Sequence, residues 1–280
     1  MRSAASDAPT LRSTPRRMAD PVLVNYRTDG GVAIIELCNP PANAYSYAMF
    51  RQLDDAILAA RMDESVHVLL LTAAGEKFFC AGADIAMLTS VTAEFKYYFC
   101  LHANETLLRL EHTAKLVIAA INGHCVGGGL EVAMACDLRI AKQSKAKFGL
   151  PEVALGVLPG TGGTQRLSRI VGRSKAMQLM LDGERFDAEQ ALQLGLVHKI
   201  LPAEDFAAAA VTFAKQYCPP NKAAGAAGLI KRAVATGSDL PLEAGLSLER
   251  ELQQRLFTGQ DAKIGLAAFG AGQAPVFTGK

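Results

Sequence analysis

Residues 116–141 read LVIAAINGHCVGGGLEVAMACDLRIA, and this stretch decides the fold. Its first six residues are an apolar run of the kind that forms a strand buried on both faces, and the Asn-Gly pair after them predicts a turn. Three glycines then lead into an apolar stretch that predicts a helix ending near Cys136, and residues 138–141 predict another strand. A strand, a turn, a helix and a strand in this order indicate an α/β fold.

The same alternation of strands and helices extends to both sides of this stretch. It begins near Val22, and Ala-rich helical patterns dominate after Gly160. The further strands are predicted at residues 32–37, 66–71 and 196–200, and the helices at residues 49–60, 94–111, 203–217, 222–236 and 241–257. We therefore expect an α/β core over residues 20–200, a helical region over residues 201–280 and a disordered leader over residues 1–19.

The leader has other interpretations. It holds four arginines and a single acid among small and hydroxyl residues, and two prolines interrupt any amphipathic helix there. A translation start at Met18 and an organelle transit peptide over residues 1–17 are the alternatives to a disordered segment.

Composition narrows the class of protein. The 280-residue chain is 50% hydrophobic and 20% charged, which provides enough apolar surface for a globular core. Its formal net charge of +2 lacks the basic excess of a nucleic-acid binder, and no apolar run is long enough to span a bilayer. The six cysteines form no C-x-x-C pair and no cluster with histidine. We expect free thiols, no metal site and a cytoplasmic protein that binds neither nucleic acid nor membrane.

Two glycine-bearing loops and two glutamates carry the candidate chemistry. Glycine lets a ligand approach the backbone amides closely, and Gly128 lies at the start of a predicted helix, where free amides favour negative charge. Glu131 follows three residues later on an otherwise apolar helix, and Glu152 lies in another apolar stretch. Carboxylates that share such a site have pKa values pushed apart, which makes one acid and one base. Two separate structural hydrogen bonds are the alternative.

Sequence patterns for other chemistries are absent. The chain has no G-x-x-x-x-G-K-[ST] loop and no G-x-S-x-G elbow. The glycines at residues 160–163 do not complete a dinucleotide-binding pattern, because Gln165 stands at its last position. Phosphate-loop, dinucleotide and serine-hydrolase chemistry are therefore not indicated.

Five motifs follow one another along the chain. They are FCAGADI (79–85), IAAINGHCVGGGLE (118–131), CD (136–137), FGLPE (148–152) and PGTGGTQRL (159–167). In this order they resemble the enoyl-CoA hydratase/isomerase (crotonase) family, and the resemblance runs from about Val22 to the C-terminus. It implies a crotonase-like spiral of ββα turns and a C-terminal helical trimerisation region, with a homotrimer or a hexamer of paired trimers.

The resemblance also implies roles for single residues. The amides of Ala81 and Gly128 would form an oxyanion hole for the thioester carbonyl of an acyl-CoA. Glu131 would deprotonate a water for attack at C3, and Glu152 would exchange the proton at C2. The Gly160 amide would help to hold the water. The substrate-binding residues that the resemblance implies are Ala81, Gly82, Ala83, Asp84, Gly128 and Gly160.

The activity implied is enoyl-CoA hydration without a metal or redox cofactor, coenzyme A being part of the substrate. Isomerisation of the double bond needs only one carboxylate, so the presence of both glutamates favours hydration. Another acyl-CoA reaction of the family, such as hydrolysis or decarboxylation, is an alternative. An RNA-binding role, known in one branch of hydratase-like proteins, is a second alternative that the near-neutral charge disfavours.

Some positions depart from the family pattern or invite another interpretation. Ala86 stands where hydratases often have a lysine that contacts a CoA phosphate. The possible substitutes are Lys77, Lys96 and Lys115, which are otherwise solvated surface residues. Tyr45 and Tyr47 either trim the acyl pocket or are half-buried aromatics at a helix start. Cys80 and His124 adjoin the two loops, and we expect neither to be catalytic.

Overall fold

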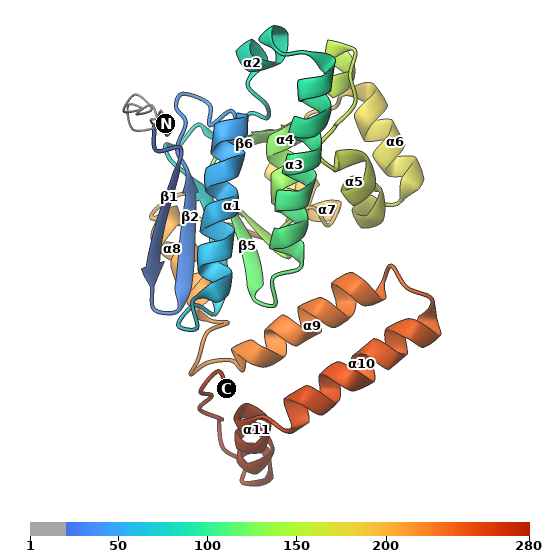
Figure 1. Cartoon of the computed structure of the whole chain (residues 1–280). Helices are drawn as coiled ribbons and strands as arrows, with labels where there is room; N and C mark the ends of the chain where they lie inside the picture. The colour runs from blue at the N-terminus through green and yellow to red at the C-terminus, as the bar shows by residue number, and fades with distance from the viewer. Residues whose placement is uncertain (1–20) are drawn as a thin grey trace, which may run out of the picture.

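A six-stranded sheet forms the centre of the molecule (Figure 1). Its strands are β1 (Val24–Asp29), β2 (Val32–Leu37), β3 (Val68–Ala73), β5 (Leu116–Ile121), β7 (Leu138–Lys142) and β9 (Lys199–Leu201). They lie in the order β1-β2-β3-β5-β7-β9, and only the β1–β2 pair is antiparallel. The computed structural model describes residues 21–280, so the predictions for residues 1–19 and for a start at Met18 lie outside the described residues.

A second, smaller sheet carries the two glycine-bearing loops. Its strands are β4 (Phe78–Cys80), β6 (His124–Val126) and β8 (Phe148–Gly149), all parallel. No pattern in the sequence predicts this sheet, because strands of two or three residues are too short to show a hydrophobic period. Each loop therefore follows a short strand of this sheet, and the two strands are hydrogen-bonded neighbours.

Helices surround both sheets. They are α1 (Tyr47–Met62), α2 (Ile85–Ser90), α3 (Ala93–Glu111), α4 (Gly128–Met134), α5 (Gly163–Val171), α6 (Arg173–Asp182), α7 (Ala188–Gln193), α8 (Phe206–Lys215), α9 (Ala224–Gly237), α10 (Leu242–Phe257) and α11 (Gln260–Gly270), together with a 3-10 helix, η1 (Glu152–Leu155). Most of the predicted helices are confirmed to within a few residues.

The central strands of the main sheet, β2, β3 and β5, are buried on both faces, whereas most of the edge strand β1 is exposed. Ile35 of β2 packs in the same cluster as Ile57 of α1, whereas its neighbour Ile34 points to the opposite face and packs with Phe206 and Ala210 of α8. This alternation follows from the two-residue period of a strand. Figure 1 shows α1 in front of the sheet and α8 behind it. Helix α8 thus packs on the core, although it lies within residues 201–280, which were predicted to form a separate helical region.

The remaining C-terminal helices extend away from the core. Helices α9 and α10 lie side by side below it, and α11 follows at their end (Figure 1). The buried ammonium of Lys231 joins α9 to the core, since it donates to Leu110 O at 2.9 Å and lies 2.9 Å from the Asp137 carboxylate. A buried charge needs such partners to offset the loss of water.

Strand boundaries test the sequence predictions most closely. Strands β2 and β5 have the predicted bounds, and β3 begins two residues later than predicted. The strand predicted at 196–200 was misplaced, because the amides of Leu196 and Val197 both donate to Ala191 O and so cannot pair with the sheet. Within residues 21–280, no helix is both long and apolar enough to cross a membrane.

Candidate active site

The first loop leaves β4 and enters α2. The N–H of Ala81 donates to Ala42 O at 3.0 Å. Two residues later, the N–H of Ala83 has no acceptor among the residues that the structure describes. The expectation that the Ala81 amide donates to the substrate is therefore corrected, because this N–H is already hydrogen-bonded to Ala42 O. Ala83 presents the free amide of this loop.

The second loop turns sharply between β6 and α4. Gly127 has φ +54° and Gly128 is the first residue of α4, so the Gly128 amide has no partner within the helix. No other acceptor within residues 21–280 takes it. A Cβ on Gly82 would lie 3.1 Å from Gly128 N, which shows that the two loops lie against each other.

Glu131 projects from the first turn of α4 and is 1% exposed. Its Oε1 accepts hydrogen bonds from Thr161 N at 2.7 Å and Gly163 N at 2.6 Å. Burial, together with the nearby Glu152, raises the pKa of this carboxyl to about 7 against the opposing effect of the two amides and Arg166. A carboxyl with a pKa near neutrality can both take and give a proton.

Glu152 is the first residue of η1. A Cβ on Gly127 would lie 2.9 Å from Glu152 Oε1, so this carboxylate lies against the second loop. Its other oxygen, Oε2, is buried and has no hydrogen-bond partner among the described residues. Burial raises the pKa of Glu152 as well. An unpaired carboxylate oxygen of this kind is available for a substrate or a water.

One cavity of about 570 Å³ joins these groups. Of the residues implied by the family resemblance, those that line it are Ala81, Gly82, Ala83, Gly128, Glu131, Glu152 and Gly160. Asp84 does not line it, and its carboxylate caps α2 by accepting from Ala86 N at 2.8 Å and Met87 N at 3.2 Å. The N-cap explains its place in the motif.

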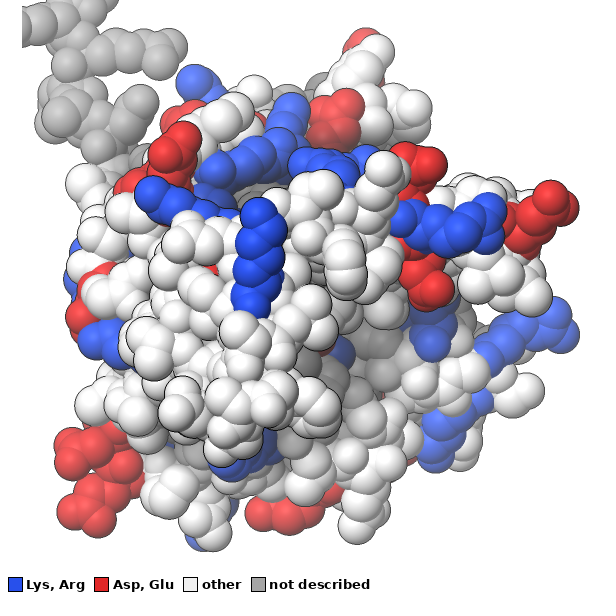
Figure 2. All heavy atoms as spheres, turned by 90° about the horizontal axis from the view of Figure 1, so that it is seen from below, with Lys and Arg blue, Asp and Glu red and all other residues white. Residues whose placement is uncertain are grey.

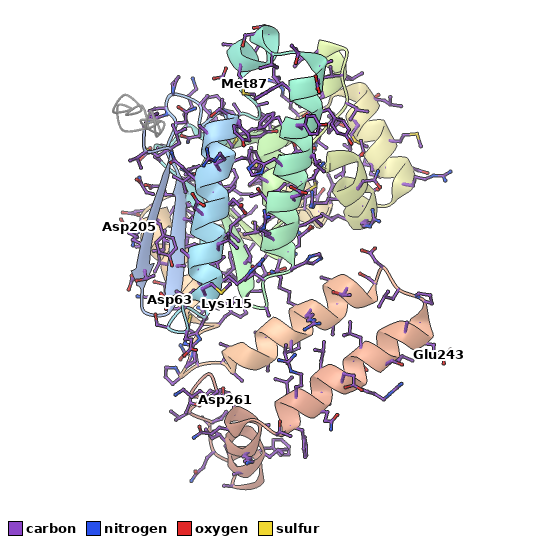
Figure 3. The ribbon with its side chains drawn as sticks, viewed as in Figure 1. Asp63, Met87, Lys115, Asp205, Glu243 and Asp261 are labelled. Atoms are coloured by element: carbon purple, nitrogen blue, oxygen red, sulfur yellow. The ribbon has the colours of Figure 1, made fainter. Side chains whose placement is uncertain are left out.

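The three lysines considered as substitutes for the missing lysine differ in their position relative to the cavity. Lys96 lines the cavity. Lys115 instead donates to Ala60 O and Asp63 O at the C-terminal end of α1. Figure 3 shows this end of α1 far from Met87 of α2. Lys77 lies 5.7 Å above the Phe78 ring. Of the three lysines, only Lys96 lines the cavity.

Of the two tyrosines, Tyr45 is buried and lines the cavity, whereas Tyr47 is exposed and does not. Cys80 is buried, and burial raises its thiol pKa to about 12, which keeps it protonated. Nδ1 of His124 accepts from Lys147 N at 3.0 Å. Neither Cys80 nor His124 lines the cavity.

Comparisons with known proteins show the family to which the chain belongs. The family model described as enoyl-CoA hydratase/isomerase matches residues 27–280. The chain belongs to the enoyl-CoA hydratase/isomerase family. A short-chain-enoyl-CoA hydratase of Clostridium acetobutylicum is 38% identical over 242 residues, which are 86% of this chain and 92% of the relative. A probable enoyl-CoA hydratase of Rhizobium meliloti is 41% identical over 246 residues, 86% of this chain and 92% of the relative.

Solved structures of the family show the same fold. A crystal structure of an enoyl-CoA hydratase from Geobacillus kaustophilus superposes with a TM-score of 0.89 at 39% identity, covering 92% of this chain and 97% of that chain. A second, from Bacillus anthracis, has a TM-score of 0.86 at 33% identity, covering 92% of this chain and 100% of that one. The crotonase-like α/β fold expected from the motifs is thereby confirmed.

The raised pKa of Glu131 predicts how the free energy of unfolding of this protein depends on pH. Its folded pKa of about 7 lies above the ordinary value of 4.5, so the folded protein holds the proton longer than the unfolded chain. The free energy of unfolding should therefore fall as pH rises from about 4.5 to about 7. We expect Glu131→Gln to remove this loss and to be more stable than wild type by about 2–3 kcal/mol above pH 7.

The measurement is urea unfolding of both proteins between pH 4 and 8, with ~0.5-unit steps. The exposed Glu204→Gln serves as the matched control, since it removes a carboxylate from the surface. A stability gap that stays constant across the pH range would contradict the raised pKa of Glu131.

Proposed function

We propose that this protein is an enoyl-CoA hydratase that adds water across the double bond of a trans-2-enoyl-CoA to give a 3-hydroxyacyl-CoA. The observation that carries the proposal is the shared cavity in which two carboxylates, Glu131 and Glu152, lie beside two free amides, those of Ala83 and Gly128. Hydration needs both sets of groups. The amides stabilise charge on the thioester oxygen, and the carboxylates move two protons.

The amides act on the thioester. Attack of water at C3 moves electron density onto the carbonyl oxygen, and the N–H groups of Ala83 and Gly128 are oriented to stabilise it there. One such donor is typically worth about 2.7–4 kcal/mol of the barrier. This replaces the pair of Ala81 and Gly128 that the motif alone suggested.

The carboxylates act on the water and on C2. Glu131 is held by Thr161 and Gly163 through one oxygen, which leaves the other to take a proton from water, and Gly160 lines the same cavity. Glu152 delivers a proton to C2. Water adds to an alkene that the thioester already polarises, so the proposed reaction uses no metal or redox cofactor. Coenzyme A belongs to the substrate.

The test is an assay of the purified protein with trans-2-enoyl-CoAs and 3-enoyl-CoAs of matched chain length. A hydratase converts the 2-enoyl substrates to 3-hydroxyacyl-CoA faster than it moves the double bond of the 3-enoyl substrates. The relatives named for short-chain-enoyl-CoA and crotonyl-CoA make crotonyl-CoA the first substrate to try, followed by long, branched and cyclic acyl chains. Double-bond migration without hydration would replace the proposal by isomerase activity.

We also propose a homotrimer or a pair of trimers. Viewed from below, the surface carries few charged side chains at its centre, and most lie towards its rim (Figure 2). Large apolar side chains are exposed on α9, α10 and α11, namely Ile230, Val234, Leu242, Leu246, Phe257, Leu266 and Phe269. Burial against a second copy would remove this surface from water. Light scattering during size-exclusion chromatography tests the proposal, and a stable active monomer at micromolar concentration would contradict it.

For the compartment we propose the cytoplasm. All six cysteines are free thiols, and four of them are buried, which is typical of a reducing environment. Relatives include bacterial proteins and three described as mitochondrial. The mitochondrial matrix is the alternative if residues 1–17 are a transit peptide, and localisation of the tagged full-length chain would separate the two.

A further inference from the structure

Tyr45 contacts all three loops that build the site. Its N–H donates to Gly82 O at 2.9 Å, and its carbonyl accepts from Asp84 N at 2.9 Å. These two bonds flank Ala83, so the backbone of Tyr45 fixes the direction of the free Ala83 amide.

The side chain of Tyr45 reaches the other two loops. Its ring packs edge-on against Phe50, with centroids 4.8 Å apart, and in a tilted arrangement against Phe99, with centroids 6.0 Å apart. The hydroxyl at its tip lies against Gly128, because a Cβ added there would collide with it. The same hydroxyl lies 3.0 Å from Thr161 Oγ1. The rigid Tyr45 ring thus places its hydroxyl between Gly128 and Thr161, whose loop binds Glu131.

Thr161 transmits this contact to the carboxylate. Its N–H donates to Glu131 Oε1 at 2.7 Å, and its carbonyl accepts from Arg166 Nη1 at 3.1 Å. Arg166 is fixed in turn by two hydrogen bonds of 2.7 Å to the carboxylate of Glu111. The backbone of Thr161 is therefore held by Arg166, and its side chain by Tyr45. Thr161 is 3% exposed, so water cannot readily replace the hydroxyl partner.

We propose that Tyr45 is a positioning residue: through Thr161, its hydroxyl holds the Glu131 carboxylate in register with the amides of Ala83 and Gly128. The inference rests on the proposed hydratase function. The charged and titratable groups that face Glu131 are Glu152 of η1, Arg166 of α5 and Tyr45 itself. Those that face the Tyr45 hydroxyl, besides Glu131, are Cys80 and Cys100.

The variant Tyr45→Phe tests this role, since it keeps the ring between Phe50 and Phe99 and removes only the hydroxyl. We expect kcat to fall about 10-fold with KM changed less than about 2-fold, because substrate contacts remain and the alignment of a proton-transferring group is lost. A weakened Thr161 amide bond stabilises the Glu131 carboxylate less, so its pKa should rise. The acid limb of the kcat/KM profile should therefore move up by about 0.5–1 pH unit.

Two sets of controls separate positioning from simple destabilisation. Tyr47→Phe removes a hydroxyl two residues away, on a ring that is exposed and outside the cavity, and should leave kcat and the pH profile as in wild type. Thr161→Val removes the partner hydroxyl and should reproduce the shift of the acid limb. Thr161→Ser retains a hydroxyl and should lose less activity than Thr161→Val.

The outcomes distinguish this inference from the function on which it rests. Wild-type protein that hydrates no enoyl-CoA contradicts the proposed function. Wild-type hydration with an unshifted acid limb in Tyr45→Phe overturns the role of Tyr45, whatever happens to its melting temperature. A shifted limb in both Tyr45→Phe and Thr161→Val, with Tyr47→Phe unchanged, supports it.

Discussion

Glu131→Gln and Glu152→Gln should each keep the fold and lose crotonyl-CoA hydration by about 10²–10⁴-fold, the usual contribution of a positioned proton-transfer group. The glutamine carbonyl at position 131 can still accept from Thr161 N and Gly163 N, so the loop that holds Glu131 keeps its hydrogen bonds. At position 152 no hydrogen bond of Oε2 is lost, because that oxygen has no partner among the described residues.

Steady-state kinetics with circular dichroism at one protein concentration provides the measurement, and Glu204→Gln is the surface control. Near-wild-type hydration by either variant would remove the two-carboxylate mechanism. If Glu152→Gln alone abolished turnover, and Glu131→Gln did not, proton transfer by a single carboxylate would explain the result and isomerisation would become the better account.

Gly128→Ala should lower kcat by about 10²–10³-fold, the usual effect of losing one oxyanion-hole donor. The added methyl group would collide with the Tyr45 hydroxyl and ring. Since Tyr45 is fixed by Phe50 and Phe99, the first turn of α4 must move instead, and the Gly128 amide moves with it.

The matched control for this substitution is Gly225→Ala. Gly225 lies on α9, and a Cβ there meets no heavy atom within 4 Å. Alanine also favours the helix, so activity should be retained and stability should rise slightly. Full activity of Gly128→Ala would show that the amide of residue 128 does not act on the substrate.

The fold was predictable where a single segment carries enough apolar residues to show its period. Strand β5 is a six-residue apolar run, and β2 is apolar apart from Glu36. Both are buried on both faces, and their bounds were predicted correctly. The strands of the small sheet are two or three residues long, and their pairing depends on partners more than 20 residues away. No local pattern could reveal them.

In the candidate site, too, some residues could be recognised from the sequence and others could not. Glu131, Glu152 and Gly128 stand out because their chemistry is unusual for their surroundings. The choice between Ala81 and Ala83 depends on which amide is already bonded, and the acceptor of Ala81 is the carbonyl of Ala42, far away in the sequence. The contact of Tyr45 with Thr161 spans 116 positions. Such information exists only in the folded chain.

The most direct test of the central claim is the fate of crotonyl-CoA when the wild-type protein acts on it in deuterium oxide enriched in oxygen-18. Mass spectrometry and NMR of the product should show 3-hydroxybutyryl-CoA with the solvent oxygen at C3 and one deuterium at C2. A product without solvent oxygen whose double bond has moved to C3, or a free coenzyme A thiol released by thioester cleavage, would contradict the assignment of hydratase activity.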